Sequence, residues 1–293
     1  MSRALTKRFI SLTGPLAAVF GVLAVGGAVG APLGQTTMSV EYDDPTWSPG
    51  GKQLAFVART TVSDGDVSQT TASLMTMALN RRVPREVATL RPDRVAWPDW
   101  SPDGRRIVFG AQYLYVVDAS GRRLRELGAG CCASWGPGGR KIAFSTGPET
   151  QSEIQVMDVT GRNRLVAASP NQTHSYWGST WSPDGERLAF FSDSAPDVAT
   201  PARTSLAAIG RYRGPVRTLR SGVYAAEPDW APSGKKIAFN GIRVLELTTK
   251  RLSALHEGQH PRWSPDGRRL AFVHQGEVFV MNADGTNVRQ LTR

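Results

Sequence analysis

The sequence predicts an all-β protein: a six-bladed β-propeller of four-stranded antiparallel blades, preceded by an N-terminal export segment. Three observations predict it. A Trp-x-Pro-x-Gly segment recurs six times, each copy continues into an apolar strand that reaches a phenylalanine, and no useful helical periodicity follows residue 35. The turns span 47–51, 100–104, 135–139, 181–185, 230–234 and 263–267, and the phenylalanines are Phe56, Phe109, Phe144, Phe190, Phe239 and Phe272.

The chemistry of the repeated turn explains the first two strands of each unit. Proline presets φ for the second position of a type I turn, and the final glycine accepts a positive φ without steric cost. A third apolar stretch follows, such as Tyr113–Asp118 or Glu277–Met281, and then a short fourth one, such as Leu124–Leu127 or Val288–Leu291. Each repeat is therefore expected to hold four strands.

Six such units in series indicate a propeller, because an isolated sheet that is apolar on both faces must bury both of them. We expect the propeller to occupy residues 36–293 as one domain. The tryptophans are unevenly spaced, which predicts loop insertions at Thr60–Thr71 in the first blade and Ser192–Arg203 in the fourth.

The first thirty residues have the features of a secretory signal. Met1–Arg8 is basic, Leu16–Val29 is apolar, and small residues surround Gly30. We expect residues 1–30 to act as a cleaved signal peptide or, alternatively, as a retained N-terminal anchor. The protein is then exported, and is periplasmic, secreted or associated with the cell envelope.

The charges are expected to separate between the two ends of the propeller. Ten of the twelve positions that follow the turn glycines are Lys or Arg, and the third-to-fourth turns add ten more. The opposite loops are comparatively acidic. The Lys and Arg side chains at the basic end either only keep the turns hydrated or dock the protein electrostatically on an anionic envelope surface. Nucleic acid is not expected as a partner, because no exposed aromatics interleave the basic residues. The third-to-fourth turn residues are Arg81, Arg82, Arg122, Arg123, Arg162, Arg164, Arg211, Arg213, Lys250 and Arg251, and the acidic residues are Glu41, Asp43, Asp44, Asp64, Asp66, Glu149, Asp193, Asp197, Glu227 and Glu257.

The repeat resembles a known family. Its last copy, Trp263–Thr292, reads Trp-Ser-Pro-Asp-Gly-Arg-Arg-Leu-Ala-Phe and continues to Val-Phe-Val-Met-Asn-Ala-Asp-Gly-Thr-Asn and Gln-Leu-Thr. This pattern is similar to TolB-like propeller repeats over residues 40–293. The resemblance implies the propeller fold. TolB itself is periplasmic and has an α/β domain before its propeller, and we expect the propeller here without that domain. Similar propellers accompany hydrolase domains or serve as polysaccharide lyases, but this chain has no Gly-x-Ser-x-Gly elbow.

The repeat register also predicts a site. Each innermost strand runs toward its tryptophan, so the residue three positions earlier should lie near the mouth of the central channel. Asp99, Asp229 and Arg262, directly before their tryptophans, should face the same funnel. Ligands usually bind in such concave places. The predicted ligand-binding residues are Asp44, Trp97, Cys132, Trp177, Glu227 and His260.

Several of these residues also have structural interpretations. The aspartates could bond strand ends, and Trp97 and Trp177 could belong to the core. Cys131 and Cys132, the only cysteines, are either two small buried thiols or a strained vicinal disulfide. No metal and no cofactor are predicted, because no Cys/His spacing motif is present; a zinc site with Glu227 and His260 is the alternative.

We therefore predict a monomeric binding or scaffold propeller that recognises a protein, peptide or glycan at its funnel mouth, without catalysis. The alternative is a polysaccharide lyase or hydrolase that acts in the same funnel. A lyase of this type needs several converging histidines, and only His260 falls at the predicted mouth, with His174 in a nearby loop. A third hypothesis is a purely structural module in which the mouth residues have no role.

Overall fold

The structure is a computed structural model that describes residues 36–64, 67–90, 95–110, 112–147, 151–169, 174–194, 203–210 and 214–293. The predicted export segment lies outside these residues, as do Asp66, Glu149, Asp197, Arg211 and Arg213 of the two predicted charged ends. Among the described residues, no helix is long and apolar enough to span a membrane.

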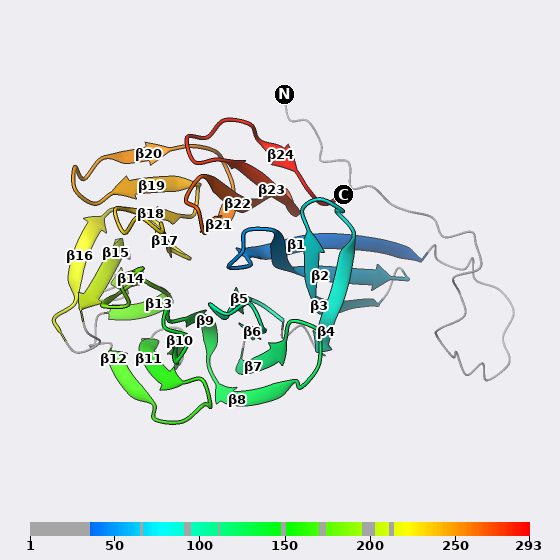
Figure 1. Ribbon diagram of the computed structural model, residues 1–293, viewed down its shortest axis with the longest axis horizontal. Helices are drawn as coiled ribbons and strands as arrows, with labels where there is room; N and C mark the ends of the chain where they lie inside the picture. The colour runs from blue at the N-terminus through cyan, green and yellow to red at the C-terminus, as the bar shows by residue number, and fades with distance from the viewer. Residues whose placement is uncertain are drawn as a thin grey trace, which may run out of the picture.

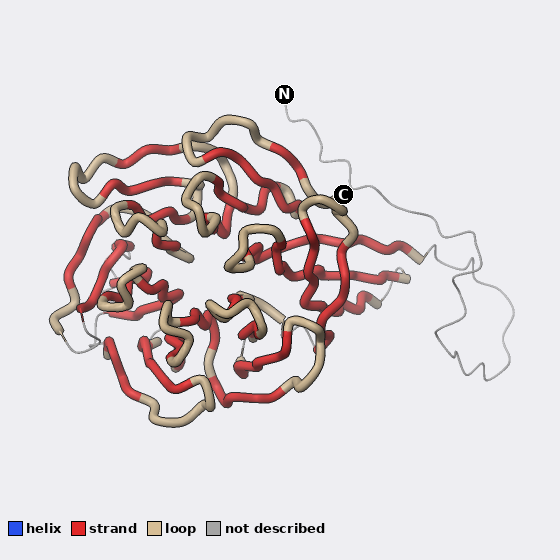
Figure 2. Tube along the Cα trace, in the orientation of Figure 1, coloured by secondary structure: helices blue, strands red, loops and turns tan. Residues whose placement is uncertain are grey.

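The described part of the chain contains strands and turns but no α-helix (Figure 2). Its twenty-four strands form six antiparallel sheets of four strands each. The strands are β1 (Thr37–Trp47), β2 (Gln53–Ser63), β3 (Ser68–Ala78), β4 (Pro84–Leu90), β5 (Asp99–Trp100), β6 (Arg106–Phe109), β7 (Tyr113–Asp118), β8 (Arg125–Ala129), β9 (Cys131–Trp135), β10 (Lys141–Thr146), β11 (Glu153–Asp158), β12 (Leu165–Ala168), β13 (His174–Trp181), β14 (Arg187–Ser194), β15 (Arg203–Gly210), β16 (Arg217–Ser221), β17 (Asp229–Trp230), β18 (Lys236–Phe239), β19 (Arg243–Glu246), β20 (Leu252–Ala254), β21 (Gln259–Trp263), β22 (Arg269–His274), β23 (Glu277–Asn282) and β24 (Arg289–Gln290).

The six sheets follow one another around a central axis as the blades of a propeller (Figure 1). Each blade is made of four consecutive strands, with its first strand innermost and its fourth at the rim. The prediction of an all-β, six-bladed propeller is therefore confirmed.

The repeated turn has the geometry that its sequence predicts. In the second blade, the Gly104 amide donates to the carbonyl of Ser101 at 2.8 Å, and Gly104 has a φ of 69°. The Ser101 hydroxyl also accepts the Arg106 amide at 2.9 Å, which joins the two sides of the turn. The six turn glycines have φ values between 65° and 71°, so the same turn is built six times.

The core lies between the blades rather than within any one of them. Six clusters of buried apolar side chains each combine residues from two neighbouring blades, and the six phenylalanines after the turns are fully buried in them. The blades are thus held together by burial of apolar surface from water, the main favourable term in folding. One cluster joins Trp47, Leu54, Phe56 and Met77 of the first blade to Ala271, Val278, Val280 and Leu291 of the last.

The ring closes between the last and first blades without exchange of a strand within the described residues. Besides the shared apolar cluster, the Tyr42 amide donates to the carbonyl of Gly276 at 2.7 Å. The Trp47 indole donates to the carbonyl of Arg262 at 3.0 Å, and the Arg269 guanidinium lies 4.6 Å above the same indole. Apolar packing, side-chain contacts and one backbone hydrogen bond therefore close the ring in place of a shared strand.

The basic turns gather at one end, as predicted. The two kinds of turn in a blade are joined there by backbone hydrogen bonds, for example from Leu79 to Lys52 and from Ala283 to Arg268. Some of this basic charge is part of the fold, because arginines that follow the turn glycines lie over the tryptophan of the next blade. The pairs are Arg106 on Trp135, Arg187 on Trp230 and Arg269 on Trp47.

The insertion predicted in the first blade is mostly strand rather than loop. Strands β2 and β3 stay paired out to Ser63 and Ser68. The extra residues are rich in threonine and valine, which favour the extended backbone, and the Thr61 and Thr70 hydroxyls lie 2.9 Å apart across the hairpin. The corresponding extension in the fourth blade runs into residues outside the described part of the chain.

Candidate functional site: the funnel mouth

The six residues three positions before the repeat tryptophans share one unusual backbone conformation. All have a φ between 48° and 56°, in the left-handed region, although only one of them is glycine. A bulky residue such as Trp97 is rarely found there, and each such residue costs the fold roughly 1–2 kcal/mol. Strain of this kind persists where the surrounding structure imposes it, often at functional sites. The residues are Asp44, Trp97, Cys132, Gly178, Glu227 and His260.

In four of the six blades the left-handed residue lies at a β-bulge, where the register between the innermost strand and its neighbour shifts. The shift is seen between Asp43 and Thr46, and again between Gln259 and Arg262. Bulges bend a strand and redirect a side chain. In these four blades the bulge interrupts the regular alternation of side chains along the innermost strand. In the second and fifth blades, Trp97 and Glu227 precede the short strands β5 and β17.

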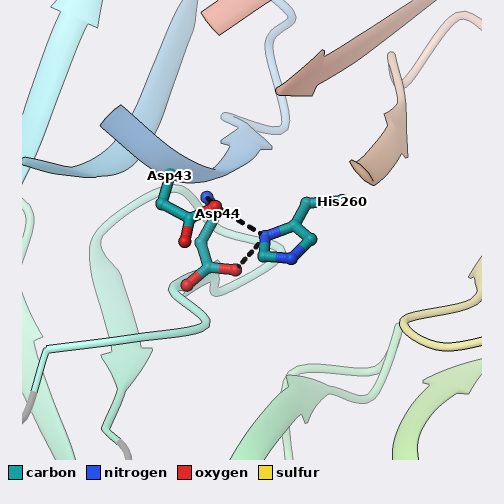
Figure 3. A group of neighbouring side chains, drawn as sticks. All are labelled: Asp43, Asp44 and His260. Carbon is teal, nitrogen blue, oxygen red and sulfur yellow. Dashed lines mark hydrogen bonds and ion pairs between the residues drawn. The ribbon is translucent and has the colours of Figure 1, made fainter. Parts of the chain in front are cut away.

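His260 is the centre of the polar contacts at the mouth (Figure 3). Its Nδ1 lies 2.9 Å from an oxygen of Asp43 and 2.5 Å from an oxygen of Asp44, both from the first blade. At the opposite side of the imidazole, its Nε2 lies 2.8 Å from an oxygen of Glu227 in the fifth blade. One imidazole therefore links carboxylates from the two blades that flank its own.

Trp97 extends this network to the opposite side of the channel. Its indole donates to Glu227 at 3.0 Å, which spans the ring from the second blade to the fifth. Its backbone amide donates to Asp44 at 3.0 Å, so the carboxylate of the first blade holds the strained backbone of the second. Contacts among four blades thus converge at the mouth.

The carboxylates and the imidazole of this network each stabilise the charged form of the other. Burial raises the pKa of the Asp44 carboxyl, but the His260 imidazolium and the Trp97 amide outweigh it, so the pKa lies below its ordinary value. Burial lowers the pKa of His260, but Asp44, Asp43 and Glu227 together hold that pKa well above its ordinary value. His260 is therefore a cation that is enclosed by three carboxylates.

Two more carboxyl groups lie deeper in the channel. Burial raises the pKa of Asp99 to about 7 and that of Asp229 to about 6. The positive charge of the nearby Arg262 guanidinium lowers both pKa values and so offsets part of this rise. Each aspartate also accepts a backbone amide of the next blade, Trp135 at 2.7 Å and Trp263 at 2.6 Å. These residues therefore join neighbouring blades and at the same time place ionisable groups in the channel.

A central cavity of about 210 Å³ is lined by residues from the second to the sixth blade. It runs from Trp97, Cys132 and Glu227 at the mouth, past Asp229, to Pro183 at the turn end. Pockets for drug-sized ligands usually measure about 300–1,000 Å³. The cavity is therefore better matched to a single side chain or a small ion than to an extended sugar chain.

The structure brings together five of the six residues predicted to bind a ligand: Asp44, Trp97, Cys132, Glu227 and His260. Trp177 lies elsewhere, because its half-buried indole packs against the apolar cluster between the fourth and fifth blades. The structure therefore gives Trp177 the core position that the sequence left open.

Two polar residues that support the mouth were not predicted. Asn240 accepts the His260 amide at 2.9 Å through its side chain, and the Ser145 hydroxyl accepts the Gly178 amide at 3.1 Å. Each follows the buried phenylalanine of the preceding blade, where other copies have an apolar residue or glycine. A polar residue at that repeat position is the signal that would have identified them.

The mouth also contains a set of groups suited to a divalent metal ion. Asp43, Asp44 and His260 each offer one ligand atom, and these atoms lie within 4.8 Å of one another. Carboxylate and imidazole together suit zinc or manganese. Because metal binding needs an unprotonated imidazole nitrogen, the raised pKa of His260 opposes it.

The fold and the mouth define a class of protein: a six-bladed propeller with polar groups gathered at one end of its central channel. Residues 35–242 match the family of the TolB beta propeller domain, and the chain belongs to that family. The resemblance of the repeats to TolB-like propellers is therefore confirmed. No curated protein matches the sequence.

Solved structures share the fold at low sequence identity. TolB from Acinetobacter baumannii is 19% identical with a TM-score of 0.57, over 84% of this chain and 61% of that one. A protein from Agrobacterium tumefaciens described as TolB is 20% identical with a TM-score of 0.60, over 88% and 89%. An oligogalacturonate lyase in complex with manganese is 13% identical with a TM-score of 0.54, over 82% and 89%. This chain thus spans about three fifths of the Acinetobacter TolB chain.

Proposed function

We propose that the protein is a non-catalytic binding propeller of the cell envelope that recognises a basic segment of a protein partner at its funnel mouth. The observation that carries this proposal is the convergence of Asp43, Asp44 and Glu227 on the single imidazolium of His260. The site already holds one cation of its own. An arginine or lysine of a partner, bound beside Glu227 or in place of His260, would meet carboxylates set in the geometry that a cation needs.

The size and surroundings of the site support a peptide rather than a glycan. The cavity beneath the mouth has room for about one side chain. Glu41 on β1, Asp193 on β14, and Asp64 and Glu257 in connections between strands lie toward the same end, which adds long-range attraction for a basic partner. The basic turn end would face the anionic envelope surface and leave the mouth free for its partner.

The proposal is tested by fluorescence anisotropy with three labelled peptides of equal length: arginine-rich, glycine–serine and glutamate-rich. We expect only the arginine-rich peptide to bind, with an affinity that falls as salt rises. Glu227→Gln should weaken it by at least about tenfold, since a desolvated charge pair is lost. Glu246→Gln is the matched control, because Glu246 is paired with Lys236 at the turn end. Equal binding of all three peptides, or equal loss in both variants, would refute the proposal.

A lyase is the second candidate, favoured by the Asp43, Asp44 and His260 ligand set and by the fold shared with the manganese-bound lyase. The other described histidines do not join His260: His256 and His274 pack around Phe279 and Phe272, and His174 lies beside Tyr176. Manganese-dependent release of unsaturated products from oligogalacturonides would favour this candidate over the binding propeller.

A further inference from the structure

The two cysteines lie at the mouth but take no part in the network of carboxylates and imidazolium on which the proposed function rests. Cys131 and Cys132 are the only cysteines of the chain. They begin β9, the innermost strand of the third blade, and Cys132 is the left-handed residue of that blade. Both are half-buried, and Cys132 lines the central cavity.

The bulge brings the two sulfur atoms together. In a regular strand, successive side chains point to opposite faces. Here Cys132 has a φ of 56°, and the register of β9 against β10 shifts between Ala143 and Ser145. As a result both side chains turn to the same side, and their Sγ atoms lie 2.8 Å apart, closer than two non-bonded sulfur atoms normally approach. A disulfide bond of about 2 Å would bring the two sulfur atoms roughly 0.8 Å closer together.

The same geometry makes such a bond easy to reduce. The Cα atoms of adjacent residues are about 3.8 Å apart, whereas bridged cysteines usually keep theirs about 4.4–6.8 Å apart. The ring closed by two neighbouring cysteines is therefore strained, and strained, partly exposed disulfides are the labile ones.

We propose that Cys131 and Cys132 form a reversible dithiol–disulfide site at the funnel mouth, which a low-molecular-weight or protein disulfide oxidises and which, when reduced, chelates thiophilic trivalent arsenic. The Cys131 thiolate attacks one sulfur of the oxidant disulfide and releases the other as a thiol. The Cys132 sulfur then attacks Cys131 in this mixed disulfide and releases the second thiol. Two electrons and two protons pass from the cysteines to the oxidant, and one S–S bond forms between them.

The order of the two steps follows from the surroundings. Burial raises the pKa of the Cys132 thiol well above its ordinary value, and contact with Cys131 and the charges of Glu227 and Asp44 raise it further. Because the thiolate is the attacking form, Cys132 is a poor first nucleophile. It is well placed for the second step, which is intramolecular and joins sulfur atoms already in contact.

The test begins with the purified protein equilibrated over a series of reduced-to-oxidised glutathione ratios. Samples are quenched with acid, denatured and alkylated, and the mass of the protein is measured by mass spectrometry. We expect the oxidised protein to lack two hydrogens and to carry no alkyl group, and dithiothreitol to restore two alkylated cysteines. Two free thiols in the most oxidising buffer, or disulfides only between chains on a non-reducing gel, would overturn the proposal.

Single variants test the order of attack and the chelation. Cys132→Ser should retain one glutathione as a stable mixed disulfide, whereas Cys131→Ser should retain little or none. Phenylarsine oxide should bind the reduced wild-type protein with one-to-one stoichiometry and should be lost from both variants. Retention of glutathione by Cys131→Ser alone would overturn the assigned order, and arsenical binding to either variant would overturn the chelation. The wild-type glutathione series does not depend on the folding of any variant, nor on peptide binding at Glu227.

Discussion

The turn end and the mouth of this propeller repeat their backbone with the same regularity, but they use their side chains differently. At the turn end, all six copies keep proline and glycine, and a Cβ on each turn glycine would lie 3.3–3.9 Å from the proline of the preceding blade. At the mouth, six left-handed residues are equally uniform in φ, yet they are Asp, Trp, Cys, Gly, Glu and His. The repeat therefore supplies the geometry at both ends, and the mouth alone varies the chemistry.

This difference indicates where the strain of the fold is concentrated. Glycine accepts a positive φ at no steric cost, so the turns are relaxed. Five mouth positions accept the cost of a side chain in the same region of φ. Such a cost is tolerated when the side chain does something that glycine cannot, and at Asp44, Glu227 and His260 it forms an ionic network.

The largest expected effect comes from removing the cation of the mouth. His260→Ala leaves Asp44, which is only 3% exposed, without its charged partner, and breaking a buried pair costs about 3–5 kcal/mol. Lys236→Ala, which breaks an exposed pair at the turn end, should cost about 0–1 kcal/mol. Both values are measured by urea unfolding at neutral pH. Similar small losses in both variants would mean that the mouth network contributes no more than a surface contact.

The stability lost in His260→Ala should also depend on pH. Because the pKa of His260 is raised on folding, its contribution is fully present below pH 6.5 and is lost as pH rises through the raised value. The gap in unfolding free energy between wild type and His260→Ala should therefore narrow at alkaline pH. Added imidazole should restore part of the stability of the variant, by filling the space between the carboxylates.

Asp99 in the channel and Asp103 at the turn allow the two ends to be compared within the second blade, because their pKa values shift in opposite directions. The unfolded chain ionises Asp99 near its ordinary pKa of 3.8, whereas the folded protein keeps the proton until about pH 7, so stability falls as pH rises across that window. Asp99→Asn should remove this fall and add on the order of a few kcal/mol at neutral pH.

Asp103, at the turn, should behave in the opposite way. The Ser101 hydroxyl and the Arg105 amide lower the pKa of Asp103, so its contribution is present above pH 3.8 and is lost as the pH falls below that value. Asp103→Asn should thus cost a small amount of stability at neutral pH. Unfolding curves recorded from pH 3 to pH 9 compare the two variants, and pH profiles of the same sign would contradict the channel environment assigned to Asp99.

Much of the fold and the position of the site were predictable, because a repeat fixes both. Six copies of one turn established the strand order, and counting back from each tryptophan located Asp44, Trp97, Cys132, Glu227 and His260 at one end. The contacts among them were not predictable. The bond from Trp97 to Glu227 joins residues 130 positions apart across the ring, and no local pattern specifies the rotamers that meet there.

The orientation of Trp177 shows another limit. It stands one residue before the left-handed position, as Asp43 and Cys131 do, but its large apolar ring gains more by burial against the next blade than by exposure at the mouth. Position in the repeat therefore predicts the backbone, whereas the choice between core and channel depends on how much space the neighbouring blade leaves.

The smallest expected difference is that between two glycine variants, one at each end, which tests whether the two ends impose the same backbone cost. Gly234 at a turn and Gly178 at the mouth have φ values of 68° and 55°, and a Cβ at either would make only ordinary contacts. Alanine at each should therefore cost about the same, roughly 1–2 kcal/mol. Gly50→Ala is the control, since its φ is not in the left-handed region and a Cβ there meets nothing within 4 Å. A much larger loss at Gly234 than at Gly178 in urea unfolding would mean that the turns keep glycine for a reason other than φ, and the two ends would then differ in backbone as well as in chemistry.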